Sequence, residues 1–150
     1  MKLPFNNKSK SKTKKNVLFV CVENSARSQM AEGIFRKYAP SDYEPLSAGT
    51  VPKSKINPLA AEVMVEIGID ISSQKPKELS EEMIRNADKI INMGCMDKNF
   101  CPALFVPKVR DWGIEDPKGK PIEKVREIRD EIERKISEMV EVIGKENMNK

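Results

Sequence analysis

Histidine is absent from this chain of 150 residues, and cysteine is scarce, with three copies. Without histidine, no Cys–His pair can activate a nucleophile, and a closed zinc site would have to join scattered thiols to carboxylates. We therefore expect no metal site. The odd number of cysteines also argues against a structural disulfide framework, as expected for a chain in the reducing cytoplasm.

Long apolar runs are lacking as well. The first apolar run, residues 17–22, is too short for the hydrophobic region of a secretion signal or for a membrane span, so we expect a cytoplasmic protein that does not bind membranes. Residues 1–16 are rich in lysine, serine and asparagine, and they predict a flexible basic tail. The net charge is only +4, much of it in this tail, and aromatic residues make up 5% of the chain, so nucleic-acid binding is not expected.

Residues 17–150 predict a single catalytic domain in which strands alternate with helices. Apolar runs predict strands at residues 17–22, 44–50, 89–93 and 104–106. Amphipathic stretches predict helices at residues 28–38, 57–68, 77–86 and 121–143. Asn57 and Ser80 are expected to cap the second and third of these helices. The alternation predicts an α/β protein, a three-layer sandwich around a four-stranded parallel sheet, whose ligands bind beyond the carboxyl ends of the strands.

The first strand runs directly into a loop that can hold an anion. The apolar run ends at Cys21, and the helical pattern begins after Arg27 and Ser28. Backbone N–H groups at such a helix start favour an oxyanion and a thiolate. We predict that Cys21 is a nucleophile, that Arg27 grips two oxygens of a tetrahedral anion, and that Ser28 hydrogen-bonds the thiolate. The residues predicted to bind the anion are Val22, Glu23, Asn24, Ser25, Ala26 and Arg27. The alternative is a buried structural cysteine.

A proton donor is expected after the last strand, at the same edge of the sheet. Asp116 precedes Pro117, which fixes the chain beside it. A carboxylic acid close to a bound oxyanion is favoured in its protonated form and could protonate a leaving oxygen. Asp111 and Glu115 compete for this role, and an ordinary Asp-Pro turn without chemistry is the alternative.

The two other cysteines follow the third strand. Cys21 ends the first strand and Cys95 follows the third, so both thiols are expected at the same edge of the sheet. Cys101 lies six positions after Cys95, in a stretch without a strong structural pattern that could change shape. The alternative is a pair of unrelated thiols that take no part in chemistry.

Several of these motifs match a known family. Cys21-x5-Arg27-Ser28 together with Asp116-Pro117 resembles the low-molecular-weight tyrosine phosphatase superfamily. More closely, five segments are similar to its thioredoxin-coupled arsenate reductase branch, namely residues 24–33, 47–50, 57–60, 68–72 and 111–117. The resemblance extends from residue 16 to about residue 143, and it implies a low-molecular-weight phosphatase-like fold.

The resemblance also implies a reaction sequence. Cys21 would attack arsenate held by the loop amides and Arg27, while Asp116 protonates the departing hydroxyl. Cys95 would then attack the Cys21–arsenic adduct, releasing arsenite and leaving a Cys21–Cys95 disulfide. Cys101 would attack Cys95 in turn, and thioredoxin or a similar dithiol would reduce the resulting disulfide. No tightly bound cofactor is implied.

Other features of the sequence bear on alternatives. Related enzymes can hold potassium near the loop, and Asn24, Glu32 and Asp70 occupy matching positions, so the resemblance allows a monovalent cation. Glu23 brings a carboxylate into the loop, which suits an anion site only if it points outward. Lys118 stands where tyrosine phosphatases often carry an aromatic residue. The alternative functions are phosphate-monoester hydrolysis through a Cys21 phosphocysteine and a non-enzymatic role as an oxyanion-binding or redox-sensing partner.

Overall fold

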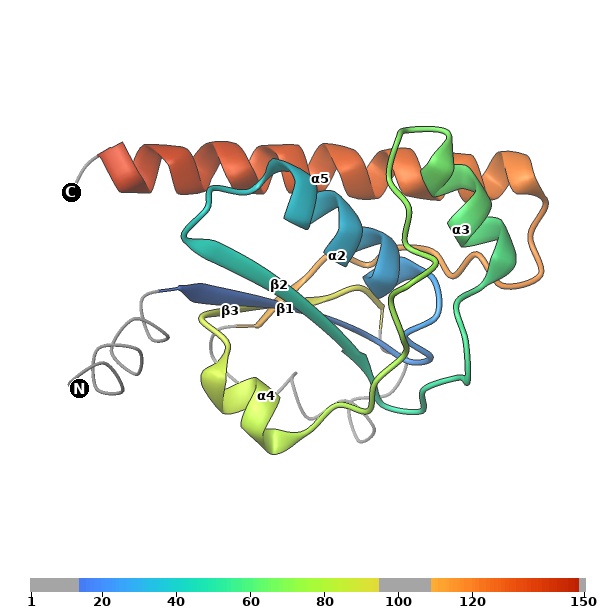
Figure 1. The fold of residues 1–150 in the computed structure, drawn as a ribbon, viewed down its shortest axis with the longest axis horizontal. Helices are drawn as coiled ribbons and strands as arrows, with labels where there is room; N and C mark the ends of the chain where they lie inside the picture. Colours follow the sequence, from blue (N-terminus) through green and yellow to red (C-terminus); the bar gives the residue numbers. More distant parts are fainter. Residues whose placement is uncertain (1–13, 95–108, 149–150) are drawn as a thin grey trace, which may run out of the picture.

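The computed structural model describes residues 14–94 and 109–148. Its elements, in chain order, are β1 (Lys15–Cys21), α2 (Arg27–Tyr38), β2 (Tyr43–Gly49), α3 (Pro58–Val65), α4 (Glu81–Asn86), β3 (Lys89–Asn92), β4 (Val109–Asp111) and α5 (Ile122–Met148). The strands form one parallel sheet in the order β2-β1-β3-β4. Helices α2, α3 and α5 lie on one side of the sheet and α4 on the other (Figure 1). The predicted three-layer α/β architecture is confirmed.

The central strand β1 is apolar on both faces because helices cover both faces. Val17 and Phe19 belong to the larger core, which β1 shares with α2, α3 and α5. Leu18 and Val20 belong to a smaller core with Ile84 of α4. Alternate residues of a strand point to opposite faces, so this continuous apolar run fills both layers at once. Cys21 is the last residue of β1, so it lies at the carboxyl edge of the sheet.

The predicted helices are present, with shorter ends in two cases. The Asn57 side chain accepts hydrogen bonds from the backbone N–H groups of Leu59 and Ala60, at 2.8 and 3.2 Å, and α3 ends at Val65. The Ser80 hydroxyl accepts from the Met83 N–H at 3.2 Å, and α4 covers only the second half of its predicted range. Both expected N-caps are therefore confirmed.

The long helix α5 packs through the predicted apolar stripe, in which Val125, Ile128, Ile132, Ile136 and Ile143 are buried. One charged residue is buried with them. The Arg129 guanidinium donates to the Val63 carbonyl at 2.8 Å and to the Glu66 carboxylate at 2.7 Å. Arg126 donates to the same carboxylate through two nitrogens. These bonds tie α5 to the end of α3, and sequence periodicity did not indicate them.

The sheet differs from the sequence-based expectation at β1 and at its last strand. β1 begins at Lys15, inside the range expected to be tail, because the Asn16 N–H donates to the Asp88 carboxylate at 2.8 Å and the Asp88 N–H donates to the Asn16 carbonyl. The last described strand is β4, and Asp111, expected after the last strand, is its final residue. The strand predicted at residues 104–106 lies outside the described residues.

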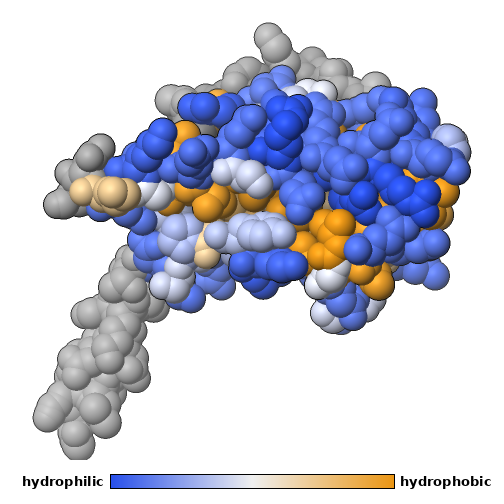
Figure 2. All heavy atoms as spheres, turned by 90° about the horizontal axis from the view of Figure 1, so that it is seen from above, coloured by the Kyte–Doolittle hydropathy of each residue, from blue (hydrophilic) through white to orange (hydrophobic). Residues whose placement is uncertain are grey.

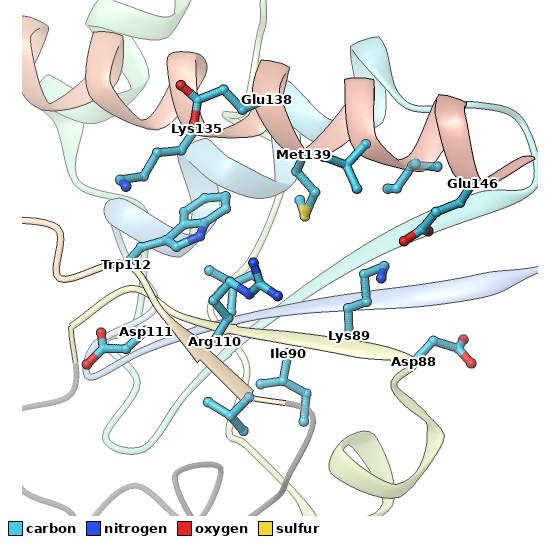
Figure 3. A pocket seen from close by; sticks show the side chains of 14 residues that line it. Asp88, Lys89, Ile90, Arg110, Asp111, Trp112, Lys135, Glu138, Met139 and Glu146 are labelled. Carbon is cyan, nitrogen blue, oxygen red and sulfur yellow. The ribbon is translucent and has the colours of Figure 1, made fainter.

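A groove of about 660 Å³ runs between β4 and α5. Figure 3 shows Trp112 and Met139 on its walls. The Lys135 ammonium lies over the Trp112 ring, 5.9 Å from the ring centroid. The face seen from above is mostly hydrophilic, with apolar patches between the charged side chains (Figure 2). No residue of the loop after Cys21 lines this groove, so it is separate from the predicted anion site. In the described ranges, no helix is long and apolar enough to cross a membrane.

Candidate active site

The thiol of Cys21 lies in a shell of hydrogen-bond donors. β1 ends at Cys21, and α2 begins at Arg27, so the loop of residues 22–26 curls between a buried strand and a helix start. The Asn24 N–H donates to the Cys21 Sγ at 3.2 Å, and the Ser28 Oγ lies 2.9 Å from the same sulfur. Because both donors stabilise negative charge, the arrangement suits a thiolate. Only 2% of Cys21 is exposed, so little of its sulfur faces solvent.

Asn24 sets the orientation of Ser28. Its backbone has a φ of +51°, a left-handed conformation that asparagine tolerates better than most residues. Its side-chain amide donates to the Ser28 Oγ at 2.7 Å. Since that bond occupies an acceptor site of the hydroxyl, the Ser28 O–H proton is free to point at Cys21. Asn24 thus does more than line the loop, because it aims the hydrogen bond that Ser28 was predicted to make.

A buried amide network holds Asn24 in turn, and sequence reasoning missed it. The Gln29 amide donates to the Asn24 Oδ1 at 3.0 Å, and the Lys77 backbone N–H donates to the same oxygen at 2.7 Å. Gln74 then donates to the Gln29 Oε1 at 2.7 Å. Gln29 is fully buried near the start of an amphipathic helix. A glutamine on the buried side of a helix was the one signal in the sequence that could have found this network.

Gly49, at the end of β2, lets the loop approach the sheet. A Cβ atom at this position would lie 2.5 Å from the Val22 carbonyl oxygen and 2.9 Å from the Asn24 nitrogen. Any larger residue would therefore push the loop away from β2. The Val51 N–H also donates to the Val22 carbonyl at 2.8 Å. The loop is thus fixed by backbone contacts on the β2 side as well as by the amide network.

Arg27 is held by two backbone carbonyls from distant segments. Its Nη1 donates to the Ile114 carbonyl at 2.9 Å and to the Gly94 carbonyl at 3.4 Å. Its Nη2 lies 3.7 Å from the Asp116 Oδ2. The Arg27 side chain is 7% exposed, so its guanidinium is fixed before any ligand arrives. A fixed, planar guanidinium at the end of the Cys21 loop is suited to bind an oxyanion.

Of the three acids considered as proton donors, the structure brings Asp116 to the loop. The Asp116 Oδ1 accepts from the Lys118 N–H at 3.0 Å, which leaves Oδ2 toward Arg27. The Asp111 carboxylate instead accepts from the Gly113 N–H at 3.0 Å. Glu115 pairs with two lysines of its own neighbourhood, at 3.5 and 3.3 Å. The geometry therefore favours Asp116 over both competitors.

The sequence of this chain matches a known protein family. A model for the low molecular weight phosphotyrosine protein phosphatases matches residues 16–149. The chain belongs to this family. It is 39% identical to an arsenate reductase of Staphylococcus aureus (strain Newman) over 122 residues, which cover 80% of this chain and 92% of that protein.

Solved structures of the family agree with the fold. An arginine phosphatase from Geobacillus stearothermophilus superposes with a TM-score of 0.80 and 28% identity, over 90% of this chain and 96% of that chain. A thioredoxin-dependent arsenate reductase from Corynebacterium glutamicum gives a TM-score of 0.73 and 39% identity, over 87% of this chain and 62% of that chain. The resemblance inferred from the motifs, to the phosphatase superfamily and to its arsenate reductases, is confirmed.

In this family member, the loop carboxylate of Glu23 is paired with two lysines. It lies 3.2 Å from the Lys118 Nζ and 3.9 Å from the Lys53 Nζ. The Lys53 N–H also donates to the Glu23 carbonyl at 3.0 Å. Two ammonium groups thus neutralise the carboxylate at the mouth of the site. This pairing offsets the repulsion between Glu23 and a bound anion.

The residues at the matching cation positions already have partners. The Asn24 Oδ1 accepts from the Lys77 backbone N–H, and the Glu32 Oε1 lies 3.9 Å from the Lys77 ammonium. Asp70 accepts from both the N–H and the hydroxyl of Ser72, at 2.9 and 2.6 Å, which holds the pKa of its carboxyl below its ordinary value. Lys77 thus already brings a positive charge to Glu32. A monovalent cation at these positions stays a prediction of the resemblance.

Cys95 and Cys101 lie outside the described residues, so their expected approach to Cys21 stays a prediction. The described chain does reach Gly94, the residue before Cys95. A Cβ atom on Gly94 would collide with the Arg27 Nη1 and would lie 3.0 Å from the Ile114 carbonyl oxygen. The chain therefore passes directly against the guanidinium one residue before Cys95.

Proposed function

We propose that this protein is an arsenate reductase that works through a relay of Cys21, Cys95 and Cys101 and is regenerated by a thioredoxin-type dithiol. The observation that carries the proposal is the contact of Gly94 with Arg27. It joins the oxyanion loop to the residue that precedes the second thiol. The similarity to arsenate reductases of S. aureus and C. glutamicum supports the same substrate.

The first step uses only residues of the described site. Arsenate binds to the backbone N–H groups of the loop and to the Arg27 guanidinium. The Cys21 thiolate, stabilised by Ser28 and the Asn24 N–H, attacks arsenic. A sulfur–arsenic bond forms, and a hydroxyl group leaves as water after it takes a proton from Asp116. Arsenic is still pentavalent at this point, so no electrons have yet been transferred.

The second step transfers the electrons. The Cys95 thiolate attacks the sulfur of Cys21, so that a disulfide bond forms and the sulfur–arsenic bond breaks. The bonding electron pair leaves with arsenic, which departs as trivalent arsenite. Two thiols are thereby oxidised to one disulfide while arsenic gains two electrons.

The third step returns the first thiol to its reduced state. Cys101 attacks Cys95, which releases the Cys21 thiolate and moves the disulfide to Cys95–Cys101. A thioredoxin-type dithiol then reduces this disulfide. The thiols of such a relay must start reduced, so we propose that the protein works in the cytoplasm, where thiols are kept reduced.

A single-turnover experiment tests this chemistry without any partner protein. The fully reduced protein is mixed with arsenate in the absence of a reductant, and arsenite and free thiols are then counted. The relay predicts about one arsenite released per chain together with the loss of two thiols. Arsenite release without thiol loss, or no arsenite at all, would contradict it.

Hydrolysis of phosphate monoesters is the second candidate function. Cys21, Arg27 and Asp116 would serve it equally well, through a phosphocysteine on Cys21, and the match to the phosphotyrosine protein phosphatase family favours it. The two functions differ in their need for the second and third thiols. Rapid hydrolysis of p-nitrophenyl phosphate, without arsenate turnover, would assign the protein to the phosphatases.

A further inference from the structure

Glu23 and Lys118 form an ion pair across the mouth of the site. Glu23 belongs to the loop that follows Cys21, whereas Lys118 belongs to the segment that carries Asp116. The Lys118 Nζ lies 3.2 Å from the Glu23 Oε2. The Lys118 backbone N–H donates to the Asp116 Oδ1 at 3.0 Å. One residue therefore contacts both the proposed proton donor and the loop carboxylate.

We propose that this Glu23–Lys118 pair selects inorganic oxyanions over their organic esters. The inference rests on the proposed oxyanion site at Cys21 and deepens it. A proton donor must lie beside the oxygen that leaves, so the leaving group departs past Asp116. Lys118 lies next to the proton donor, because its backbone N–H donates to the Asp116 carboxylate, and in the proposal its pair with Glu23 narrows this path. A departing hydroxyl is small enough to pass, whereas an organic group has to displace the ion pair.

The surroundings of the pair suit such a filter. The Glu23 side chain is only 27% exposed. Its backbone is held in place because the Glu23 carbonyl accepts from the Lys53 N–H at 3.0 Å. The Lys118 side chain is 62% exposed and can move. Pairs of this exposure are modest in strength. The filter is therefore a bias against esters, of about fivefold, and not an absolute barrier.

A carboxylate in this position has a further consequence for charge. Alone, Glu23 would repel every anion that approaches Cys21. Paired with Lys118 and Lys53, it leaves a net positive mouth that still attracts anions. The ion pair therefore selects against the organic group of an ester, and the affinity for the tetrahedral oxyanion itself is preserved.

Binding of two probes with the same head group tests the proposal. The dissociation constants of inorganic phosphate and of phenylphosphonate are measured by calorimetry for the reduced wild type, Glu23→Ala, Lys118→Ala and the double variant. We expect the preference for phosphate over phenylphosphonate to fall about fivefold in each single variant. Because both substitutions remove the same pair, the double variant should show the same preference as the single variants.

Salt dependence and a matched lysine complete the test. Raising the salt concentration should lower the preference of the wild type, because partly exposed pairs are screened, and should leave that of Glu23→Ala unchanged. Lys120→Ala removes a neighbouring lysine that pairs with Glu115, and it should retain the wild-type preference.

Unchanged preferences in both single variants, or effects that multiply in the double variant, would overturn the proposal. A wild type that binds phenylphosphonate as tightly as phosphate would also overturn it. A wild type that binds phosphate preferentially but does not reduce arsenate would leave the filter intact and overturn the proposed function instead. A wild type that binds neither probe would contradict the oxyanion site, and with it both proposals.

Discussion

Gly94 lies against the guanidinium of Arg27: its carbonyl accepts from Nη1 at 3.4 Å, and its Cα leaves no space for a methyl group. The carboxyl end of β3 and the oxyanion loop thus meet at one point. In the proposed relay, this contact brings the chain that carries the second thiol to the group that binds the substrate.

Gly94→Ala should damage the site without removing any polar group. Gly94 has a φ of +154°, and the added Cβ would displace Arg27. Because misplacing a substrate-binding group by about 1 Å can cost about 100-fold, we expect kcat/KM for arsenate to fall at least tenfold. Gly144→Ala is the control, since nothing lies within 4 Å of its Cβ position in α5. It should retain activity and stabilise the fold by about 0.5–1 kcal/mol. Equal activity in both variants would show that the Gly94 contact has no role.

Asp116→Asn should slow the chemical step more than it weakens binding. Its carboxyl lies 3.7 Å from Arg27 and is the proposed source of the proton. Loss of a general acid typically lowers kcat by about 10²–10⁴-fold. Asp111→Asn, whose carboxylate is bonded to Gly113, should lower it much less. Steady-state kinetics of the two variants decide the matter, and a full effect in Asp111→Asn with none in Asp116→Asn would move the acid role.

Ser28→Ala should weaken the nucleophile. The variant removes the hydroxyl that lies 2.9 Å from the Cys21 sulfur, and it leaves the buried Asn24 amide without an acceptor. A hydrogen bond to a charged group contributes about 1.5–3 kcal/mol, so a loss of at least tenfold in kcat/KM is expected. Ser72→Ala, which removes an exposed hydroxyl bonded to Asp70, is the matched control. The rate of single-turnover arsenite release compares them, and identical rates would contradict the role of Ser28.

The ion pairs between Glu66, at the end of α3, and the arginines of α5 should make the stability of the fold depend on pH. Hydrogen bonds from Arg126 and then from Arg129 lower the pKa of Glu66 below its ordinary value. The ionised Glu66 carboxylate therefore stabilises the fold when the pH is above the ordinary pKa of glutamate. This stabilisation is lost as the pH falls through the lowered pKa of the folded state. Glu66→Gln should therefore unfold more easily than the wild type at neutral pH, and the difference should shrink below about pH 4.

The difference in stability between Glu66→Gln and the wild type can be measured by thermal unfolding at a series of pH values from neutral to acidic. Glu141→Gln changes an exposed glutamate on α5, the helix that carries Arg126 and Arg129, and it should leave the unfolding midpoint close to that of the wild type at every pH. A difference for Glu66→Gln that stays constant across the range would show that its carboxylate does not contribute through these arginines.

Much of the fold could be predicted because its signals are local. The apolar run of β1, the stripe of α5 and the caps Asn57 and Ser80 each depend on residues close together in the sequence. β4 was missed at residues 109–111 because it is a three-residue strand at the edge of the described sheet, with two of its residues exposed. A strand of this kind has no alternating pattern, since neither of its faces is fully buried.

The site also contains local features that the sequence predicted and long-range contacts that it did not. The order of Cys21, Arg27 and Ser28 could be interpreted because a strand, a loop and a helix start follow one another directly. The bond from Lys77 to Asn24 spans 53 positions, and the bond from Arg27 to the Ile114 carbonyl spans 87. Contacts over such distances depend on the assembled sheet. The sequence also suggested that Glu23 must point outward, but it could not identify Lys118 as its partner.

The central claim is that electrons reach arsenate through three thiols. Its most direct test is the consumption of NADPH by thioredoxin reductase, thioredoxin and arsenate, with the wild type and with Cys21→Ser, Cys95→Ser and Cys101→Ser. We predict sustained turnover in the wild type and its loss in all three variants, because each exchange needs its own thiolate. Full multiple-turnover reduction by both Cys95→Ser and Cys101→Ser would contradict the relay.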